Sequence, residues 1–146
     1  MKTAKIKKLN LNAKTPTQGS SYSAGFDLYA YIPTGSTYVR PHSTEKIHTG
    51  ISIQPPEGYF GAIFARSGLA TKEGLRPANC VGVCDFDYTG EYIVSIHNDT
   101  DKDRYIYNGD RIAQLVFVPF TEVNFIEVDE LPKTDRSDSG FGSTGK

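Results

Sequence analysis

The most suggestive chemical spacing in the chain is a pair of acids, Asp85 and Asp87, within the stretch 81–98, VGVCDFDYTGEYIVSIHN. β-Rich arms flank the turn sequence DYTG at 87–90, in which glycine supplies backbone freedom, so we expect a β-hairpin. Residues two apart on a strand point to one face, and a charge buried there costs roughly several kcal/mol unless it is paired or neutralised. A carboxylate on such a hairpin could act as a general base; alternatively, both acids lie on an exposed turn.

Three further polar features could contact a ligand. Arg66-Ser67-Gly68 offers an arginine, a hydroxyl and a bare backbone to an anion, although an arginine at a strand end is more often simply solvated. Gln114 stands within an apolar run, so its amide is either a hydrogen-bonded core group or a ligand contact. Asp27 lies between two apolar residues and needs a partner if it is buried. The candidate partners of Asp27 are Arg66, Arg111 and Arg136.

The C-terminal stretch 133–146, KTDRSDSGFGSTGK, has a different composition and contains one apolar residue, Phe141. Such a stretch buries too little surface to offset a backbone entropy of roughly 1–2 kcal/mol per residue, which favours a disordered tail. Its glycines, hydroxyls and Arg136 are also the parts of a phosphate cradle, and the ring of Phe141 could stack on a base. The chain thus offers one acid as a base, several donors suited to phosphate, one ring for stacking and no metal-ligand cluster. This combination favours phosphate-ester chemistry on a nucleotide.

Many short β-rich runs separated by Gly, Pro and Asn predict an all-β barrel or sandwich. In the stretch 81–98 the second arm is expected to bury Tyr92, Val94 and Ile96 on one face. One helical turn is expected at Ser67–Lys72, with Ser67 as its N-cap. The other expected strands are Ile6–Leu11, Ala24–Ala30, Glu45–Ile53, Tyr59–Ala65, Tyr105–Tyr107, Arg111–Phe117 and Phe120–Val128.

Length and composition restrict the class of protein. The 146 residues, 38% of them hydrophobic, predict one globular domain, and the formal net charge of -1 argues against a nucleic-acid-binding or membrane-surface protein. No apolar run approaches the roughly 20 residues of a membrane span, and the lysine-rich start lacks the apolar core of a signal peptide. Extended Cys80 and Cys84 would lie about 13 Å apart, too far for a disulfide, and two thiols make a poor zinc site. We therefore expect buried, reduced thiols in a cytoplasmic protein.

Five segments, taken in order, resemble the five motifs of the trimeric dUTP diphosphatases (dUTPases). These segments are AGFDLYA (24–30), ARSGLA (65–70), GVCDFDYTGEY (82–92), NGDRIAQLVF (108–117) and RSDSGFGSTG (136–145). Ordered motifs over almost the whole chain are far more specific than a single glycine-rich match. The resemblance implies an all-β, jelly-roll-like β-barrel of the dUTPase β-clip type. It also implies Mg²⁺-dependent hydrolysis of dUTP to dUMP and pyrophosphate, which limits uracil incorporation into DNA and supplies dUMP for thymidylate synthesis.

The resemblance further implies a homotrimer with three shared active sites, each assembled from three subunits. Residues 1–131 would form the barrel domain. Residues 132–146 would form a flexible, Gly-rich arm that closes over the active site of a neighbouring subunit.

Carried over by position, Asp85 resembles the base that activates water for in-line attack on the α-phosphorus. Tyr88 resembles the tyrosine that packs beneath the sugar and rejects a 2′-hydroxyl. A uracil edge is distinguished from cytosine when a mismatch would leave buried polar groups unpaired. The family's uracil-reading positions correspond here to Asn79, Gly82, Val83, Cys84 and Ile93.

The phosphate contacts are carried over in the same way. The α- and β-phosphate binders correspond to Arg66, Ser67 and Gly68, with the amide of Gln114 beside them. Asp27 is linked to Mg²⁺ indirectly, through water, while the three phosphates would chiefly hold the ion. In the arm, Phe141 matches the ring that caps the uracil. The other substrate-binding positions of the arm, which serve the γ-phosphate, correspond to Arg136, Gly142, Ser143 and Thr144.

The sequence departs from the usual motifs at a few positions. Ala65 precedes Arg66 where proline is commoner, and Ser137 and Ser139 stand where glycine is usual. Asp138 would repel a triphosphate unless it points outward. Two alternatives stay open: the related dCTP deaminase, against which the Tyr88 motif and the intact tail argue, and a nucleotide-dependent binding protein that regulates a protein partner.

Overall fold

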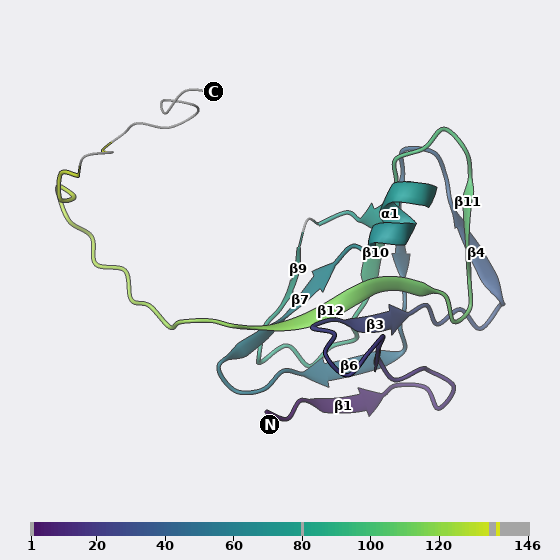
Figure 1. Ribbon diagram of the computed structural model, residues 1–146, viewed down its shortest axis with the longest axis horizontal. Coiled ribbons are helices and arrows are strands. Elements are labelled where there is room, and N and C mark those ends of the chain that lie inside the picture. Colours follow the sequence, from purple (N-terminus) through teal and green to yellow (C-terminus); the bar gives the residue numbers. More distant parts are fainter. Residues whose placement is uncertain (1, 80, 135–136, 138–146) are drawn as a thin grey trace.

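The computed structural model describes residues 2–79, 81–134 and 137, and the regular structure of this part is almost entirely strand (Figure 1). The all-β prediction is therefore confirmed. The elements are β1 (Lys5–Lys8), β2 (Thr17–Gln18), β3 (Phe26–Tyr29), β4 (Ser36–Val39), β5 (Thr44–Ile47), β6 (Ile51–Gln54), β7 (Tyr59–Phe64), α1 (Ser67–Glu73), β8 (Leu75–Pro77), β9 (Gly82–Cys84), β10 (Val94–Asn98), β11 (Arg104–Tyr107) and β12 (Arg111–Pro119).

The strands form four antiparallel sheets with the orders β2-β3-β12-β7-β9, β5-β10-β8, β1-β6 and β11-β4. In the described part of the chain these ladders do not join into a closed barrel. The α1 helix, which is only seven residues long, is the sole helix described, and it is far too short to cross a membrane.

The long strand β12 forms the centre of the largest sheet and fixes the geometry of the site. Its Ile112, Ala113 and Leu115 are buried in the core that the sheets share. Its register places Gln114 opposite Asp27 of β3 on one side and opposite Phe64 of β7 on the other. Antiparallel pairing thus brings together polar residues that are far apart in the sequence.

The stretch 81–98 does not form the expected hairpin. Strand β9 pairs with β7, whereas β10 pairs with β5 and β8 in another sheet. The predicted burial of Tyr92, Val94 and Ile96 is confirmed, and these side chains anchor the second arm in the core. The two arms therefore have different partners, and the connection between them, residues 85–91, crosses from one sheet to the other. We call residues 85–91 the Asp85 turn.

The single strand expected over Glu45–Ile53 is wrong, because the chain turns at Gly50 between β5 and β6. Gly50 has a φ of +69°, and a Cβ placed there would lie 2.8 Å from the Cβ of Ala13. Glycine adopts this left-handed conformation readily, and a larger residue would meet the neighbouring chain. The alternating pattern of the sequence continues through Gly50, although the backbone bends there and separates β5 from β6.

The strand expected over Phe120–Val128 is also wrong. This segment follows β12 and leaves the body of the molecule as an extended chain without a ladder in the described structure (Figure 1). Phe125 is 97% exposed and Ile126 is 83% exposed. A run of exposed apolar side chains along one segment often marks a surface that another chain covers. The alternation is real, but within one chain the described residues provide no partner strand for it.

Candidate active site

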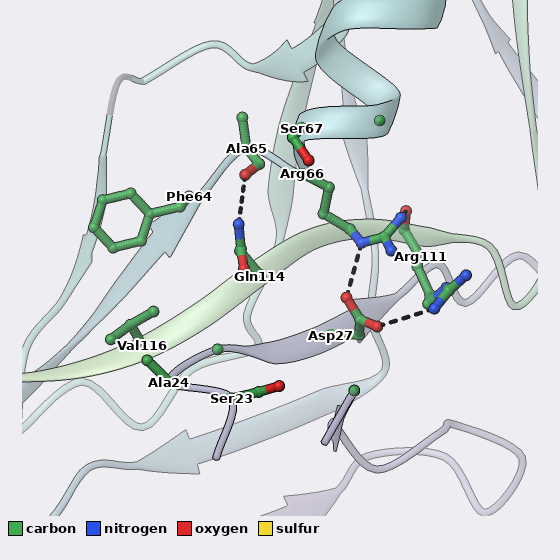
Figure 2. A pocket seen from close by; sticks show the side chains of 13 residues that line it. Ser23, Ala24, Asp27, Phe64, Ala65, Arg66, Ser67, Arg111, Gln114 and Val116 are labelled. Atoms are coloured by element: carbon green, nitrogen blue, oxygen red, sulfur yellow. Dashed lines mark hydrogen bonds and ion pairs between the residues drawn. The ribbon is translucent and has the colours of Figure 1, made fainter. Parts of the chain in front are cut away.

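A pocket of about 720 Å³ lies where β3 and β12 meet the start of α1 (Figure 2). Strand pairing supplies two of its walls, and the segment between β7 and α1 supplies a third. The pocket therefore gathers residues of the first, second and fourth predicted motifs. The predicted site residues that line it are Asp27, Arg66, Ser67, Gly68 and Gln114.

Two arginines hold the carboxylate of Asp27. Arg66 Nε donates a 2.8 Å hydrogen bond to Oδ1, and Arg111 Nη1 lies 3.4 Å from Oδ2. The side chain of Asp27 is only 15% exposed, so both its oxygens are charge-paired in a partly desolvated setting. The expectation that Arg66 and Arg111 are partners of Asp27 is confirmed. The ion pair fixes the Arg66 guanidinium at the pocket wall, where it can meet an anion.

The amide of Gln114 is oriented by contacts on both sides. Its Nε2 donates a 2.9 Å hydrogen bond to the Ala65 carbonyl, as the dashed line in Figure 2 shows. A Cβ at Gly25 would lie 2.7 Å from Gln114 Oε1, so only glycine leaves room for this orientation. Gln114 is thus a hydrogen-bonded amide that also lines the pocket; its hydrogen bond is confirmed, and its contact with a ligand stays a prediction.

Helix α1 begins at Ser67, as expected, but Ser67 is not its N-cap. Arg66 holds the cap position, with φ −89° and ψ 128°, and makes no side-chain cap bond. The Arg66 side chain is instead directed to Asp27. Ser67 and Gly68 are exposed in the first turn, and a Cβ at Gly68 would meet no heavy atom within 4 Å. Gly68 thus leaves open space in the first turn of α1, which lines the same pocket as Arg66.

The Asp85 turn borders a second pocket of about 510 Å³. Asp85 follows β9 directly, and both Asp85 and Asp87 are exposed, so neither acid lies within a strand. Phe60, Val83 and Phe120 are among the apolar side chains that line this pocket. The Asp85 carboxylate is therefore solvent-accessible and lies beside apolar side chains.

Tyr88 occupies a defined position in the Asp85 turn. Its hydroxyl donates a 2.9 Å hydrogen bond to the Glu91 carbonyl, and its side chain is close above Gly90. A Cβ at Gly90 would lie within 2.6–2.9 Å of three atoms of the Tyr88 ring and hydroxyl. A side chain at position 90 would require the Tyr88 ring to shift, and Tyr88, which is 46% exposed, remains accessible to a ligand.

The predicted uracil-reading residues lie next to the Asp85 turn. The amide of Asn79 approaches Gly82, where a Cβ would be 3.1 Å from Asn79 Nδ2. Val83 and Ile93 are 60% and 37% exposed. Cys84 is free and buried, and burial raises the pKa of its thiol, so no thiolate stands beside Asp85 near neutral pH. The reduced state expected for Cys84 agrees with the structure, whereas Cys80 lies outside the described residues.

The two pockets share no lining residue within the described structure. Phosphate-type donors line one pocket, and the predicted base borders the other. No group of three or more His, Cys, Asp or Glu residues suited to a metal ion occurs among residues 2–79, 81–134 and 137. The predicted arm residues Arg136, Phe141, Gly142, Ser143 and Thr144 lie outside the described residues, and their roles stay predictions.

The sequence motifs do not reveal the full role of some residues that build the site. Arg111 is a candidate partner of Asp27 in the sequence, and in the structure it also lines the first pocket. Gly25 leaves space for the Gln114 amide, and Glu91 accepts a hydrogen bond from Tyr88; the sequence singles out neither residue. Their roles depend on cross-strand and turn geometry, which short sequence motifs do not reveal.

An all-β chain with an arginine-paired pocket and an exposed aspartate beside a tyrosine has the parts of a nucleotide phosphohydrolase. The chain belongs to the dUTPase family, whose model matches residues 11–145. The match favours this family over the dCTP deaminase alternative.

Individual relatives agree with this membership. The deoxyuridine 5′-triphosphate nucleotidohydrolase of Syntrophotalea carbinolica is 43% identical over 143 residues, which cover 98% of this chain and 97% of the relative. The dUTPase of Staphylococcus bacteriophage 80alpha, solved with dUPNHPP, has a TM-score of 0.88 and 28% identity, with 99% of each chain covered. A mutant dUTPase from phage phi11 of S. aureus, described with a structural Mg(II) ion, has a TM-score of 0.76 and 26% identity, covering 88% of this chain and 97% of that one.

Proposed function

We propose that the chain hydrolyses dUTP to dUMP and pyrophosphate, with Asp85 activating the water that attacks the α-phosphorus in line. The observation that carries this proposal is the family match over residues 11–145, which includes both pockets. A positioned base contributes roughly 10²–10⁴-fold, and holding the water and the phosphorus together contributes further. The consequences for the cell would be less uracil in DNA and a supply of dUMP for thymidylate synthesis.

The triphosphate is assigned to the first pocket. Arg66 provides a fixed positive charge, Ser67 a hydroxyl, and Gly68 a backbone without a side chain in the way. The Gln114 amide, held against Ala65, adds a polar group in a constant orientation. Charge-assisted hydrogen bonds from such donors are among the strongest that proteins make to phosphate.

The nucleoside is assigned to the surface beside the Asp85 turn. Tyr88 would pack beneath the deoxyribose, and its fixed ring would leave no room for a 2′-hydroxyl. The uracil edge would meet main-chain and amide groups, since an unpaired polar group in such a site rejects the wrong base strongly. The residues proposed for uracil are Asn79, Gly82, Val83, Cys84 and Ile93.

The separation of the two pockets supports a site shared between copies of the chain. We call the first pocket, lined by Asp27, Arg66, Ser67, Gly68 and Gln114, the phosphate pocket. We assign the phosphate pocket to one subunit and the Asp85 turn to another, in a homotrimer of jelly-roll-like subunits. The exposed apolar side chains that follow β12, such as Phe125 and Ile126, favour an assembly that covers them. A regulatory protein partner and the cytoplasmic location stay predictions.

Magnesium is assigned mainly to the phosphates. Both oxygens of Asp27 are engaged by arginines, so direct ligation of a metal ion would break two charge pairs. The carboxylate therefore fits Mg²⁺ only as a contact through water. Bound Mg²⁺ would neutralise part of the triphosphate charge.

Substrate assays test the proposed function. We expect pyrophosphate release from dUTP, with much lower kcat/KM for UTP and dTTP, because the ring of Tyr88 and the tight uracil surface exclude the extra groups. Ammonia release from dCTP is the control for a deaminase. Hydrolysis of UTP as fast as dUTP would contradict the proposal.

Truncation after Lys133 tests the assignment of residues 132–146 as an arm that closes over a neighbouring subunit. We expect a folded trimer with greatly reduced turnover, since the contacts proposed for Arg136, Phe141 and Thr144 would be lost. Sedimentation and circular dichroism measure the fold, and pyrophosphate release measures turnover. A truncated chain that unfolds would show that this segment belongs to the barrel.

A further inference from the structure

The Asp85 turn is attached to the neighbouring loop by the side chain of Glu91. Gly50 donates its backbone N–H to Glu91 Oε1 at 2.7 Å, and His48 Nδ1 lies 2.8 Å from Oε2. The Glu91 side chain is 20% exposed, so these contacts are partly shielded from water, whereas His48 is 57% exposed. The carboxylate therefore links the end of the turn to the loop between β5 and β6.

The same residue holds Tyr88 through its backbone. The Tyr88 hydroxyl donates to the Glu91 carbonyl at 2.9 Å, and Gly90 leaves the space that the ring occupies. A displacement of Glu91 would thus move the acceptor that fixes the ring. The Glu91 backbone and the ring of Tyr92, 6.2 Å away between centroids, together set the position of the Tyr88 ring.

Several other contacts restrain this part of the chain. Tyr88 donates its backbone N–H to the Asp85 carbonyl at 3.2 Å, and its ring centroid lies 6.2 Å from that of Tyr92. Residues 85–89 are exposed and belong to no strand. Ser52 Oγ donates to the Thr89 carbonyl at 2.6 Å, and Tyr92 donates its N–H to the Ile51 carbonyl at 2.9 Å. A single isolated bridge joins Ser52 and Glu91 in the described structure. The carboxylate of Glu91 adds two contacts at the point where the turn re-enters the core.

We propose that Glu91 is a positioning residue that sets the selectivity for deoxyribose over ribose by fixing Tyr88. This inference rests on the proposed function, in which Tyr88 packs beneath the sugar. Excluding one hydroxyl requires a ring that does not yield, and a displacement of about 1 Å in an active site can cost about 100-fold. Glu91 acts through Tyr88 and through the backbone of the turn, without contact to the reacting atoms.

The test compares Glu91→Ala and Glu91→Gln with the unaltered chain, using kcat and KM for dUTP and UTP. We expect Glu91→Ala to lower the ratio of kcat/KM for dUTP over UTP by at least about tenfold, chiefly through KM. Glu91→Gln should stay within about threefold, because its amide oxygen accepts the Gly50 N–H and its nitrogen can donate to His48. The matched control is Asp101→Ala, which removes a similar 2.8 Å carboxylate contact to His42 elsewhere on the surface.

Retention of the full dUTP preference by folded Glu91→Ala would overturn the inference, and so would an equal loss in Asp101→Ala. If Glu91→Ala fails to fold, His48→Ala removes one of the two contacts and should shift the ratio in the same direction; an unchanged ratio there overturns the inference. Calorimetric binding of dUMP and UMP measures the same selectivity without turnover. The inference can therefore be judged from binding alone. Absence of dUTP hydrolysis in the unaltered chain would refute the proposed function and is measured independently of that binding.

Discussion

Asp85→Asn is expected to lower kcat for dUTP by about 10²- to 10⁴-fold while dUTP still binds, because asparagine keeps the shape of the side chain but cannot accept the proton. Asp85 is exposed in the described structure, so the substitution should leave stability nearly unchanged. Single-turnover hydrolysis of dUTP measures the chemical step, and calorimetry with a non-hydrolysable dUTP analogue measures binding.

Asp87→Asn is the matched control, since Asp87 is also exposed in the Asp85 turn and lines the same pocket. Asp87 takes no part in the proposed proton transfer, so the kcat of Asp87→Asn should fall far less than that of Asp85→Asn. Full turnover in Asp85→Asn would remove Asp85 as the base. A greater loss in Asp87→Asn would transfer that role to Asp87.

Arg66→Ala is expected to lower kcat/KM for dUTP by at least about 100-fold, largely through a higher KM. The substitution removes a cation from the phosphate pocket and also a charge partner of Asp27. Arg111 would then be left as its partner at 3.4 Å, and the Arg111 side chain is 55% exposed. Steady-state kinetics and the thermal midpoint together separate loss of binding from loss of stability.

Arg66→Lys and Arg40→Ala are informative companions to that variant. Arginine can pair with Asp27 through Nε and still present its planar guanidinium to phosphate. Lysine keeps the charge but has a single ammonium group for both contacts, so we expect partial activity. Arg40 is an arginine that lies over the Tyr38 ring, outside both pockets, and its removal should leave kcat/KM unchanged. Wild-type kinetics in Arg66→Ala would show that the triphosphate binds elsewhere.

Much of the pocket between β3, β12 and α1 could be predicted from the sequence, because its signals are local. An acid within an apolar strand requires a partner, and Asp27 has two in Arg66 and Arg111. An amide within an apolar strand requires an acceptor, and Gln114 has one in the Ala65 carbonyl. Both expectations follow from the free-energy cost of burying a polar group without a hydrogen-bond or charge partner.

The wrong expectations about the fold arose where a pattern is compatible with more than one partner. Alternation continues through Gly50, but the backbone bends there with a φ of +69° and the strand ends. The arms of 81–98 resembled a hairpin, yet β9 and β10 pair in different sheets. Alternation identifies the buried face of a strand but does not choose its neighbour.

Positioning contacts were hardest to predict. Glu91 stands on the polar face of an alternating arm, where a charge is ordinary, and its contacts with Gly50 and His48 depend on a distant loop. Gly25 matters because β3 and β12 bring it against Gln114. Tertiary register creates these contacts, and the sequence carries no local sign of them.

The central claim is that the phosphate pocket of one copy works with the Asp85 turn of another. Mixing Arg66→Ala and Asp85→Asn chains, unfolding them and refolding them together tests it most directly. Random trimers should recover about a quarter of wild-type activity, because a site needs an intact Arg66 from one copy and an intact Asp85 from another. Mixed trimers, verified with two affinity tags, that stay as inactive as either variant alone would contradict the account.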